Sequence, residues 1–203
     1  AQDDAQVAQR VEAAFSRAWQ LKQRAMQAMP EPASDPGRPR DMALQIARTA
    51  VRVLENRGQL SFPLPPDKAL GFLLVNPLGD NAYTKTTQIV ERFQRGERVA
   101  VAMAFGPDAT EHQGQAAREA FAACDTVVIA LVIKPFAWHA ARLPDWQVQL
   151  IEDLCASQTV VIVSLGIEET LQPYTHAAAL IVTESDAPVS QDAVTEYLLG
   201  KLP

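Results

Sequence analysis

The sequence has few of the residues that most site chemistries need. It contains two cysteines and three histidines among 203 residues, so neither a disulfide framework nor a zinc cluster at motif spacing is indicated. Cys124 and Cys155 each adjoin an apolar segment, which favours buried, unreacted thiols. We expect His112, His139 and His176 to face solvent or to make a single hydrogen bond, and we expect no bound metal.

An excess of positive charge and a long apolar run are also missing. Lys and Arg number 18 against 24 Asp and Glu, and the formal net charge of -6 has the wrong sign for a nucleic-acid backbone. The longest apolar stretches, near 125–133 and 159–165, are strand-sized, far short of the roughly 20 residues that cross a bilayer. The sequence predicts neither a nucleic-acid partner nor a membrane partner.

The nucleotide and nucleophile motifs are absent. Leu78-Gly79-Asp80-Asn81 has too few glycines for a dinucleotide or phosphate loop, and Ser164-Leu165-Gly166 lacks the first glycine of a nucleophile elbow. Glycoside hydrolysis needs two carboxylates on opposite sides of the scissile bond. The pairs close in sequence should point to different faces and serve as surface charge: Glu152–Asp153, Glu168–Glu169 and Glu184–Asp186. We expect no cofactor.

The hydrophobic pattern divides the chain into three parts. Apolar residues at three-and-four spacing predict a helix within 1–29, and residues 30–40 hold four prolines and form a predicted linker. Residues 41–203 form the main domain, which opens with a helix through Asn56 for which Asp41 is the candidate N-cap.

Short apolar runs then alternate with helical segments. The predicted strands are 70–75, 99–105, 126–133, 159–165 and 178–183, and the predicted helices are 82–94, 113–123, 144–156 and 190–199. Strands that are apolar at consecutive positions are buried on both faces. We therefore predict a doubly wound, mainly parallel α/β sheet flanked by helices, a three-layer sandwich, with an N-terminal helical extension.

Ligands of open α/β sheets bind beyond the carboxyl ends of the strands, so we expect binding residues there. Asn76 and Glu168 follow predicted strands and are candidates for the edge of a cleft. Phe136, Trp138 and Trp146 lie in or beside the loop 134–144, and such aromatic faces stack on sugar rings. Packing beneath that loop is the alternative role.

Several segments together resemble the C-terminal α/β sandwich of glycoside hydrolase family 3, especially its bacterial β-N-acetylglucosaminidase branch. The helix 43–56 is similar to the one that opens that domain, and 60–64 to the segment that leads into its first strand. The order of the remaining segments is also similar: Ala123–Ala130, Leu143–Ile151 with its Leu-Pro and Gln147, and Thr159–Gly166. The similarity covers about 160 residues.

The resemblance implies where catalysis takes place. Residues 14–22 resemble the last helix of the family's (β/α)8 barrel, which would precede this chain and carry the catalytic aspartate and, in the N-acetylglucosaminidase branch, an Asp/His acid-base pair. In the β-glucosidase branch the second domain supplies a glutamate from the loop that here runs Lys134–Arg142, and this loop has no carboxylate. We therefore expect no catalytic residue in this chain, an upstream barrel as its partner, and carbohydrate as a further candidate ligand.

Two other functions stay open. The first is a stand-alone carbohydrate-binding or protein-interaction module. The second is an independent small-molecule enzyme of flavodoxin-like architecture, which only the analogy of the fold supports. The sequence begins at Ala1 without methionine or a signal-peptide pattern, so we expect a processed or excised chain, with a cytoplasmic location slightly favoured.

Overall fold

The computed structural model describes residues 2–27, 38–80, 86–95, 99–133 and 142–200, and it divides into two compact units, Ala1–Pro39 and Arg40–Pro203. The first unit contains helix α1 (Gln2–Gln27), close to the predicted helix. All side chains from Val11 to Arg24 are exposed in the structure, among them Phe15 and Trp19, whose rings stack at 6.4 Å. None of the described helices is long and apolar enough to cross a membrane.

The second unit is built on a six-stranded sheet with strand order β1-β6-β5-β4-β2-β3. Neighbouring strands are parallel throughout except for β1, which runs antiparallel to β6 at one edge. The strands are β1 (Arg52–Asn56), β2 (Leu70–Val75), β3 (Val99–Phe105), β4 (Thr126–Leu131), β5 (Thr159–Ser164) and β6 (Ala179–Val182).

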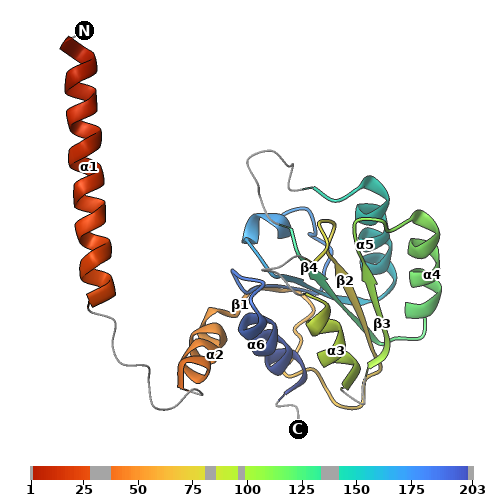
Figure 1. Ribbon diagram of the computed structural model, residues 1–203. Coiled ribbons are helices and arrows are strands. Elements are labelled where there is room, and N and C mark those ends of the chain that lie inside the picture. The colour runs from red at the N-terminus through yellow and green to blue at the C-terminus, as the bar shows by residue number, and fades with distance from the viewer. Residues whose placement is uncertain (1, 28–37, 81–85, 96–98, 134–141, 201–203) are drawn as a thin grey trace. The chain divides into compact units, whose positions relative to one another are not determined.

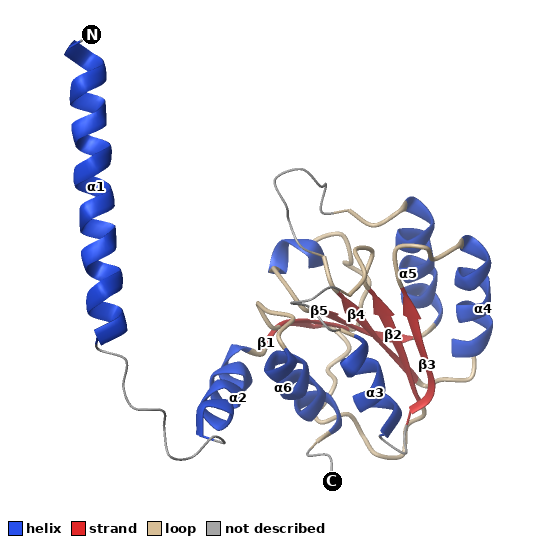
Figure 2. Ribbon diagram, viewed as in Figure 1, coloured by secondary structure: helices blue, strands red, loops and turns tan. Residues whose placement is uncertain are grey.

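Helices cover both faces of this sheet (Figures 1 and 2). One face carries α4 (Glu111–Phe121) and α5 (Asp145–Ser157), and the other carries α3 (Thr87–Arg95) and α6 (Pro188–Leu199). Each face has its own core, because successive strand residues point to opposite sides. Strands β2 and β4 are buried at every position. The predicted doubly wound, mainly parallel three-layer fold is therefore confirmed.

The predicted helix 41–56 is wrong in its second half. Helix α2 spans Arg38–Ala50, so Asp41 lies in its first turn and the last residues of the predicted linker, 38–40, are helical. Residues 52–56 are strand β1 and pair with β6 in register Arg52↔Val182 and Val53↔Ile181. The free edge of β6 offers these residues hydrogen bonds that their local pattern does not reveal, and the β-branched Val53 suits a strand.

The other boundaries differ by a few residues. Strands β2 and β3 have the predicted limits, while β4 ends at Leu131 instead of 133. Helix α3 begins at Thr87, and residues 81–85 of the predicted helix lie outside the described residues. The sequence patterns missed the short 3-10 helix η1 (Glu168–Leu171), because four residues are too few for a periodic signal.

Close packing attaches the helices to both faces of the sheet. On the face covered by α3 and α6, the rings of Phe72 and Phe93 stack with centroids 4.0 Å apart, and neither is exposed. On the face covered by α4 and α5, a Cβ at Gly71 would lie 2.6 Å from the ring of Phe121, so only glycine fits there. Cys124 is buried and Cys155 half-buried, both as free thiols, as expected from the sequence.

Candidate functional site

Polar side chains gather at the carboxyl edge of the sheet, where the parallel strands β2, β4, β5 and β6 end. They form two groups, which we name by one member each. The Asn76 cluster consists of Asn76, Asp80 and Thr86 beyond β2. The Arg52 cluster consists of Arg52, Glu168 and Glu184 beside β1, β5 and β6. A groove between α4 and α5 begins at the same edge.

The Asn76 cluster is a closed network at the end of a buried strand. Asn76 and Thr86 are 4% and 0% exposed, and the Nδ2 of Asn76 donates to Oγ1 of Thr86 at 2.8 Å. Asp80, which lies at the surface, accepts at Oδ1 from the backbone N–H and the hydroxyl of Thr86, at 2.8 and 2.6 Å. This network anchors the start of α3 to the end of β2, so its polar groups serve the fold.

The turn after β5 is closed in the same way. The hydroxyl of Ser164 is hydrogen-bonded to the carbonyl of Ile167 and to Oγ1 of Thr170, each at 2.9 Å, and Ser164 is fully buried. Thr183, at the end of the neighbouring β6, donates to the carbonyl of Ser185 at 2.7 Å. These hydroxyls shape the turns, in agreement with the absence of a nucleophile elbow.

The Arg52 cluster is open to solvent. Nη2 of Arg52 donates to Oε2 of Glu168 at 3.1 Å and to Oε1 of Glu184, and all three side chains are about half exposed. The hydrogen bonds that Arg52 donates to Glu184 and, second, to Glu168 raise the pKa of its guanidinium. Glu184 has a φ of 59°, a left-handed backbone that glutamate rarely adopts. That conformation turns the chain directly after β6, beside the contact with Arg52.

The chemistry available at the Arg52 cluster is hydrogen bonding. The guanidinium has further N–H donors, and each carboxylate has further lone pairs, all beside solvent. Such alternating donors and acceptors suit the hydroxyl groups of a sugar. No group of three or more His, Cys, Asp or Glu side chains able to hold a metal ion occurs among the described residues.

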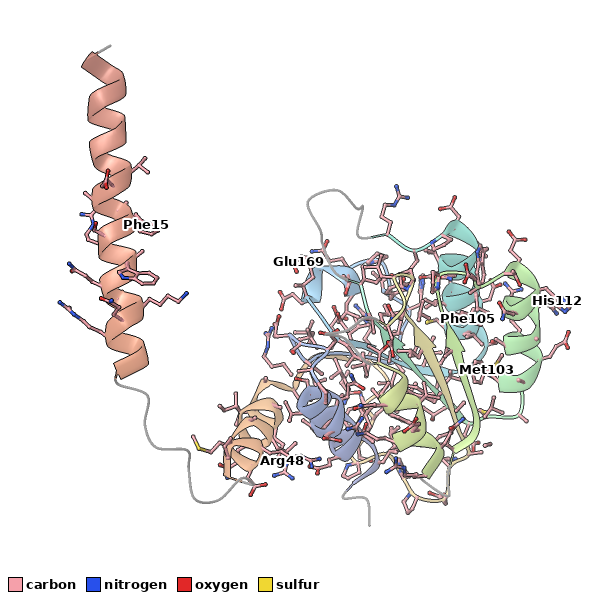
Figure 3. All side chains as sticks on the ribbon, viewed as in Figure 1. Phe15, Arg48, Met103, Phe105, His112 and Glu169 are labelled. Atoms are coloured by element: carbon pink, nitrogen blue, oxygen red, sulfur yellow. The ribbon has the colours of Figure 1, made fainter. Side chains whose placement is uncertain are left out.

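The groove between α4 and α5 has a volume of about 430 Å³ and an aromatic side chain in its wall. Trp146, in the first turn of α5, is half-buried, and its ring lies 5.6 Å from that of Phe105 at the end of β3. A Cβ at Gly114 would lie 2.9 Å from Trp146, so the missing side chain of α4 admits the indole. His112 and Gln115 of α4 and Gln149 of α5 line the groove, and His112 points outward from α4 (Figure 3).

The structure separates the sequence-predicted site residues from one another. Asn76 is a buried part of the Asn76 cluster, Glu168 belongs to the exposed Arg52 cluster, and Trp146 packs on Phe105 and Gly114 at the groove. Phe136 and Trp138 lie outside the described residues, as does His139. Trp146 packs on Phe105 and Gly114 and keeps part of its side chain accessible, while residues 134–141 of the loop beside it lie outside the described residues.

Sequence reasoning missed the pairing of Glu168 with Glu184 through Arg52. The sequence patterns pair carboxylates only with near neighbours along the chain. Glu168 and Glu184 come together because they follow β5 and β6, which are adjacent parallel strands. Arg52 was overlooked because its strand was predicted as helix. The pattern Val-Arg-Val, which alternates apolar and charged residues, was the signal that could have placed Arg52 at a strand end.

The fold and this edge define a class: a doubly wound α/β sandwich whose polar side chains lie at the carboxyl ends of its strands. Neither a protein-family model nor a curated protein sequence matches the chain. Solved structures do match it. A glycoside hydrolase family 3 β-N-acetylglucosaminidase from Paenibacillus sp. str. FPU-7 superposes with a TM-score of 0.67 and 16% identity, over 96% of this chain.

Two further solved structures are β-glucosidases. The family 3 enzyme from Bifidobacterium adolescentis matches 88% of this chain with a TM-score of 0.63 and 17% identity, and the enzyme from Listeria innocua in complex with glucose matches 87% with a TM-score of 0.59 and 21% identity. The chain spans 38%, 29% and 26% of these three proteins, respectively. The expected resemblance to glycoside hydrolase family 3 is therefore confirmed for the fold.

Proposed function

We propose that this chain is the non-catalytic C-terminal domain of a bacterial family 3 β-N-acetylglucosaminidase-like enzyme, joined to an upstream (β/α)8 barrel that hydrolyses the glycosidic bond. One observation carries the proposal. Residues 40–203 make up only about four fifths of the chain, yet the match to the Paenibacillus enzyme covers 96% of it. That match therefore includes most of α1, the helix whose sequence resembles the end of the family's barrel.

The surface of α1 supports the same proposal. Val11, Phe15, Trp19 and Leu21 are between 50% and 71% exposed, which is unusual for so many large apolar side chains on one helix. An upstream domain that packs on α1 would bury them. The loop Lys134–Arg142, which carries no carboxylate, favours the branch whose second domain takes no part in the chemistry.

The Arg52 cluster is the part of the second unit that we assign to the sugar cleft. Its exposed donors and acceptors lie at the carboxyl edge, where α/β sheets bind ligands. In this proposal Arg52 and Glu168 hydrogen-bond sugar hydroxyls and thereby position the substrate, while the barrel supplies the acid and the nucleophile.

The first test is the coding sequence upstream of the codon for Ala1. We expect an open frame of roughly 300 residues with alternating strands and helices, the size of a barrel with insertions. The joined protein should hydrolyse p-nitrophenyl N-acetylglucosaminide faster than the glucoside, and the present chain alone should hydrolyse neither. A start codon directly before Ala1, or a joined protein without hydrolase activity, would contradict the proposal.

The cleft assignment has its own matched pair of variants in the joined protein. Glu168→Gln removes the carboxylate bound to Arg52, whereas Glu169→Gln changes the exposed neighbour, labelled in Figure 3. We expect KM to rise several-fold for Glu168→Gln with kcat little changed, because a binding contact is lost. Equal KM values for the two variants would remove the Arg52 cluster from the cleft.

A stand-alone carbohydrate-binding module is the second candidate, and the groove beside Trp146 is the observation that favours it. An aromatic wall with glutamine, arginine and histidine side chains is suited to a sugar ring and its hydroxyls. Titration with N-acetylglucosamine oligomers should then change tryptophan fluorescence saturably in this chain and not in its Trp146→Phe variant. A flat titration at millimolar sugar would exclude this candidate.

A further inference from the structure

Arginine side chains converge on a second pocket, on the other face of the sheet from the groove beside Trp146. The pocket has a volume of about 300 Å³ and lies where α3 packs on α6, with Arg40 contributed from the first turns of α2. We call it the arginine pocket. It is lined by Arg40, Gln88, Glu91, Arg92, Arg95 and Asp192.

The arginine pocket is positively charged on an acidic chain. Its three guanidinium groups face two carboxylates, which leaves one net positive charge, whereas the whole chain has a formal net charge of -6. A concave site that concentrates the minority charge attracts ligands of the opposite sign. The local charge therefore points to an anion.

Arg92 is the least exposed of the three arginines, at 17%, and its hydrogen bonding is incomplete. Nε donates to Oδ1 of Asp192, which ties α3 to α6. Nη1 is buried and has no hydrogen-bond partner among the described residues. A charged donor that has lost water without gaining an acceptor costs free energy, and a ligand oxygen would recover that cost once the guanidinium turns toward the pocket.

Arg40 and Arg95 are held only loosely. Both side chains are 75% exposed. Nη2 of Arg40 lies 3.8 Å from Oδ2 of Asp192, and Nη2 of Arg95 lies 3.5 Å from Oε2 of Glu91, both longer than a charge-assisted hydrogen bond. Exposed pairs of this kind contribute little to stability. Both guanidinium groups are therefore free to turn toward a bound ligand.

We propose that the arginine pocket binds a phosphate-type oxyanion, as the phosphate group of a small phosphomonoester. One guanidinium fork satisfies a planar carboxylate, whereas a tetrahedral group presents oxygens to forks that approach from three sides. A volume of about 300 Å³ is at the lower end of small-molecule sites, which suits a phosphorylated metabolite rather than a polymer. This proposal is independent of the glycosidase assignment.

The test uses inorganic phosphate as the probe for this chain at neutral pH, with sodium chloride added to keep the ionic strength constant. Amide and arginine side-chain resonances are followed by NMR during the titration. We expect saturable shifts confined to α3 between Gln88 and Arg95, to α6 around Asp192 and to Arg40 of α2. Shifts that do not saturate, or that acetate reproduces with equal or higher affinity, would overturn the proposal.

A pair of double variants separates this site from general charge effects. Arg40→Gln with Arg95→Gln removes the two exposed forks and should raise the Kd for phosphate at least about tenfold, since each lost contact is a charged hydrogen bond. Arg57→Gln with Arg142→Gln removes two exposed arginines elsewhere in the same unit and should leave Kd unchanged. Equal Kd values for the two double variants would contradict the proposal.

Discussion

The Asn76 cluster and the Arg52 cluster occupy the same edge of one sheet, yet they differ in burial and in the role that follows from it. Asn76 and Thr86 are buried and hydrogen-bond each other and Asp80, so their polarity holds a loop in place. Arg52, Glu168 and Glu184 are half exposed and keep donors and acceptors for solvent. Position at the carboxyl edge therefore does not make a polar residue a binding residue, because burial decides whether its donors and acceptors can reach a ligand.

The largest effect should come from breaking the buried cluster. Thr86→Val keeps the shape but removes the hydroxyl that accepts from Asn76 and donates to Asp80, so the buried amide loses the nearer of its two acceptors. We expect the free energy of unfolding to fall by about 1–3 kcal/mol, measured by chemical denaturation. Thr49→Val is the control, since its exposed hydroxyl bonds only a carbonyl of its own helix, and it should change stability by less than about 0.5 kcal/mol. Equal losses would show that burial is not the deciding factor.

A second substitution tests whether the groove at this edge belongs to the fold or to the site. Gly114→Ala places a Cβ 2.9 Å from Trp146 and should destabilise the protein by about 1–3 kcal/mol while shifting Trp146 fluorescence. Gly106→Ala is the control, because its Cβ would meet no described atom within 4 Å. If Gly114→Ala were as mild as Gly106→Ala, Trp146 would be mobile enough to serve a ligand.

The half-buried Cys155 and the buried Tyr174, at the opposite, amino edge, should make the stability depend on alkaline pH. Burial, and to a lesser extent Glu152, raises the pKa of Cys155 to about 11 and that of Tyr174 to about 12. In the unfolded chain the pKa values of the two groups are about 9 and 10. The stability that their burial as neutral groups allows is therefore fully present below about pH 9. It should fall as the pH rises from about 9 to about 12.

Denaturation curves at several alkaline pH values, under reducing conditions, measure this loss. Cys155→Ala should reduce the part of the loss that begins near pH 9, to which Cys124 also contributes because burial raises its pKa, and should keep the part due to Tyr174, which begins near pH 10. A wild-type stability that stays level up to about pH 11 would contradict the raised pKa values.

The smallest stability change is expected at the exposed cluster. Arg52→Gln should leave the denaturation midpoint almost unchanged, and any difference should vanish at high salt, because exposed ion pairs are screened. Arg57→Gln, which breaks the exposed contact with Glu55, is the matched control. A large, salt-resistant loss for Arg52→Gln would mean that the cluster, with the left-handed Glu184, supports the end of the sheet.

The alternation of apolar runs and helical segments sufficed to predict the architecture. Consecutive apolar residues such as Leu70–Val75 can be buried on both faces only if helices cover the sheet twice, and that is a property of the local pattern. The candidate site was less accessible. Asn76 and Glu168 were chosen by the same rule, but the sequence could not tell which would be buried within hydrogen bonds and which would face solvent.

The order of the main helices and strands from β2 onward, the parallel sheet and the absence of nucleotide and nucleophile motifs follow from the sequence alone, because these depend on periodicity and spacing along the chain. Only the tertiary structure decided that residues 52–56 form a strand, since the pairing partner is β6, more than 120 residues away. It likewise decided that Arg52 bridges Glu168 and Glu184, and that Arg92 and Arg95 of α3 line one pocket with Arg40 of α2. Such contacts follow from the packing of distant segments, which leaves no local signature in the sequence.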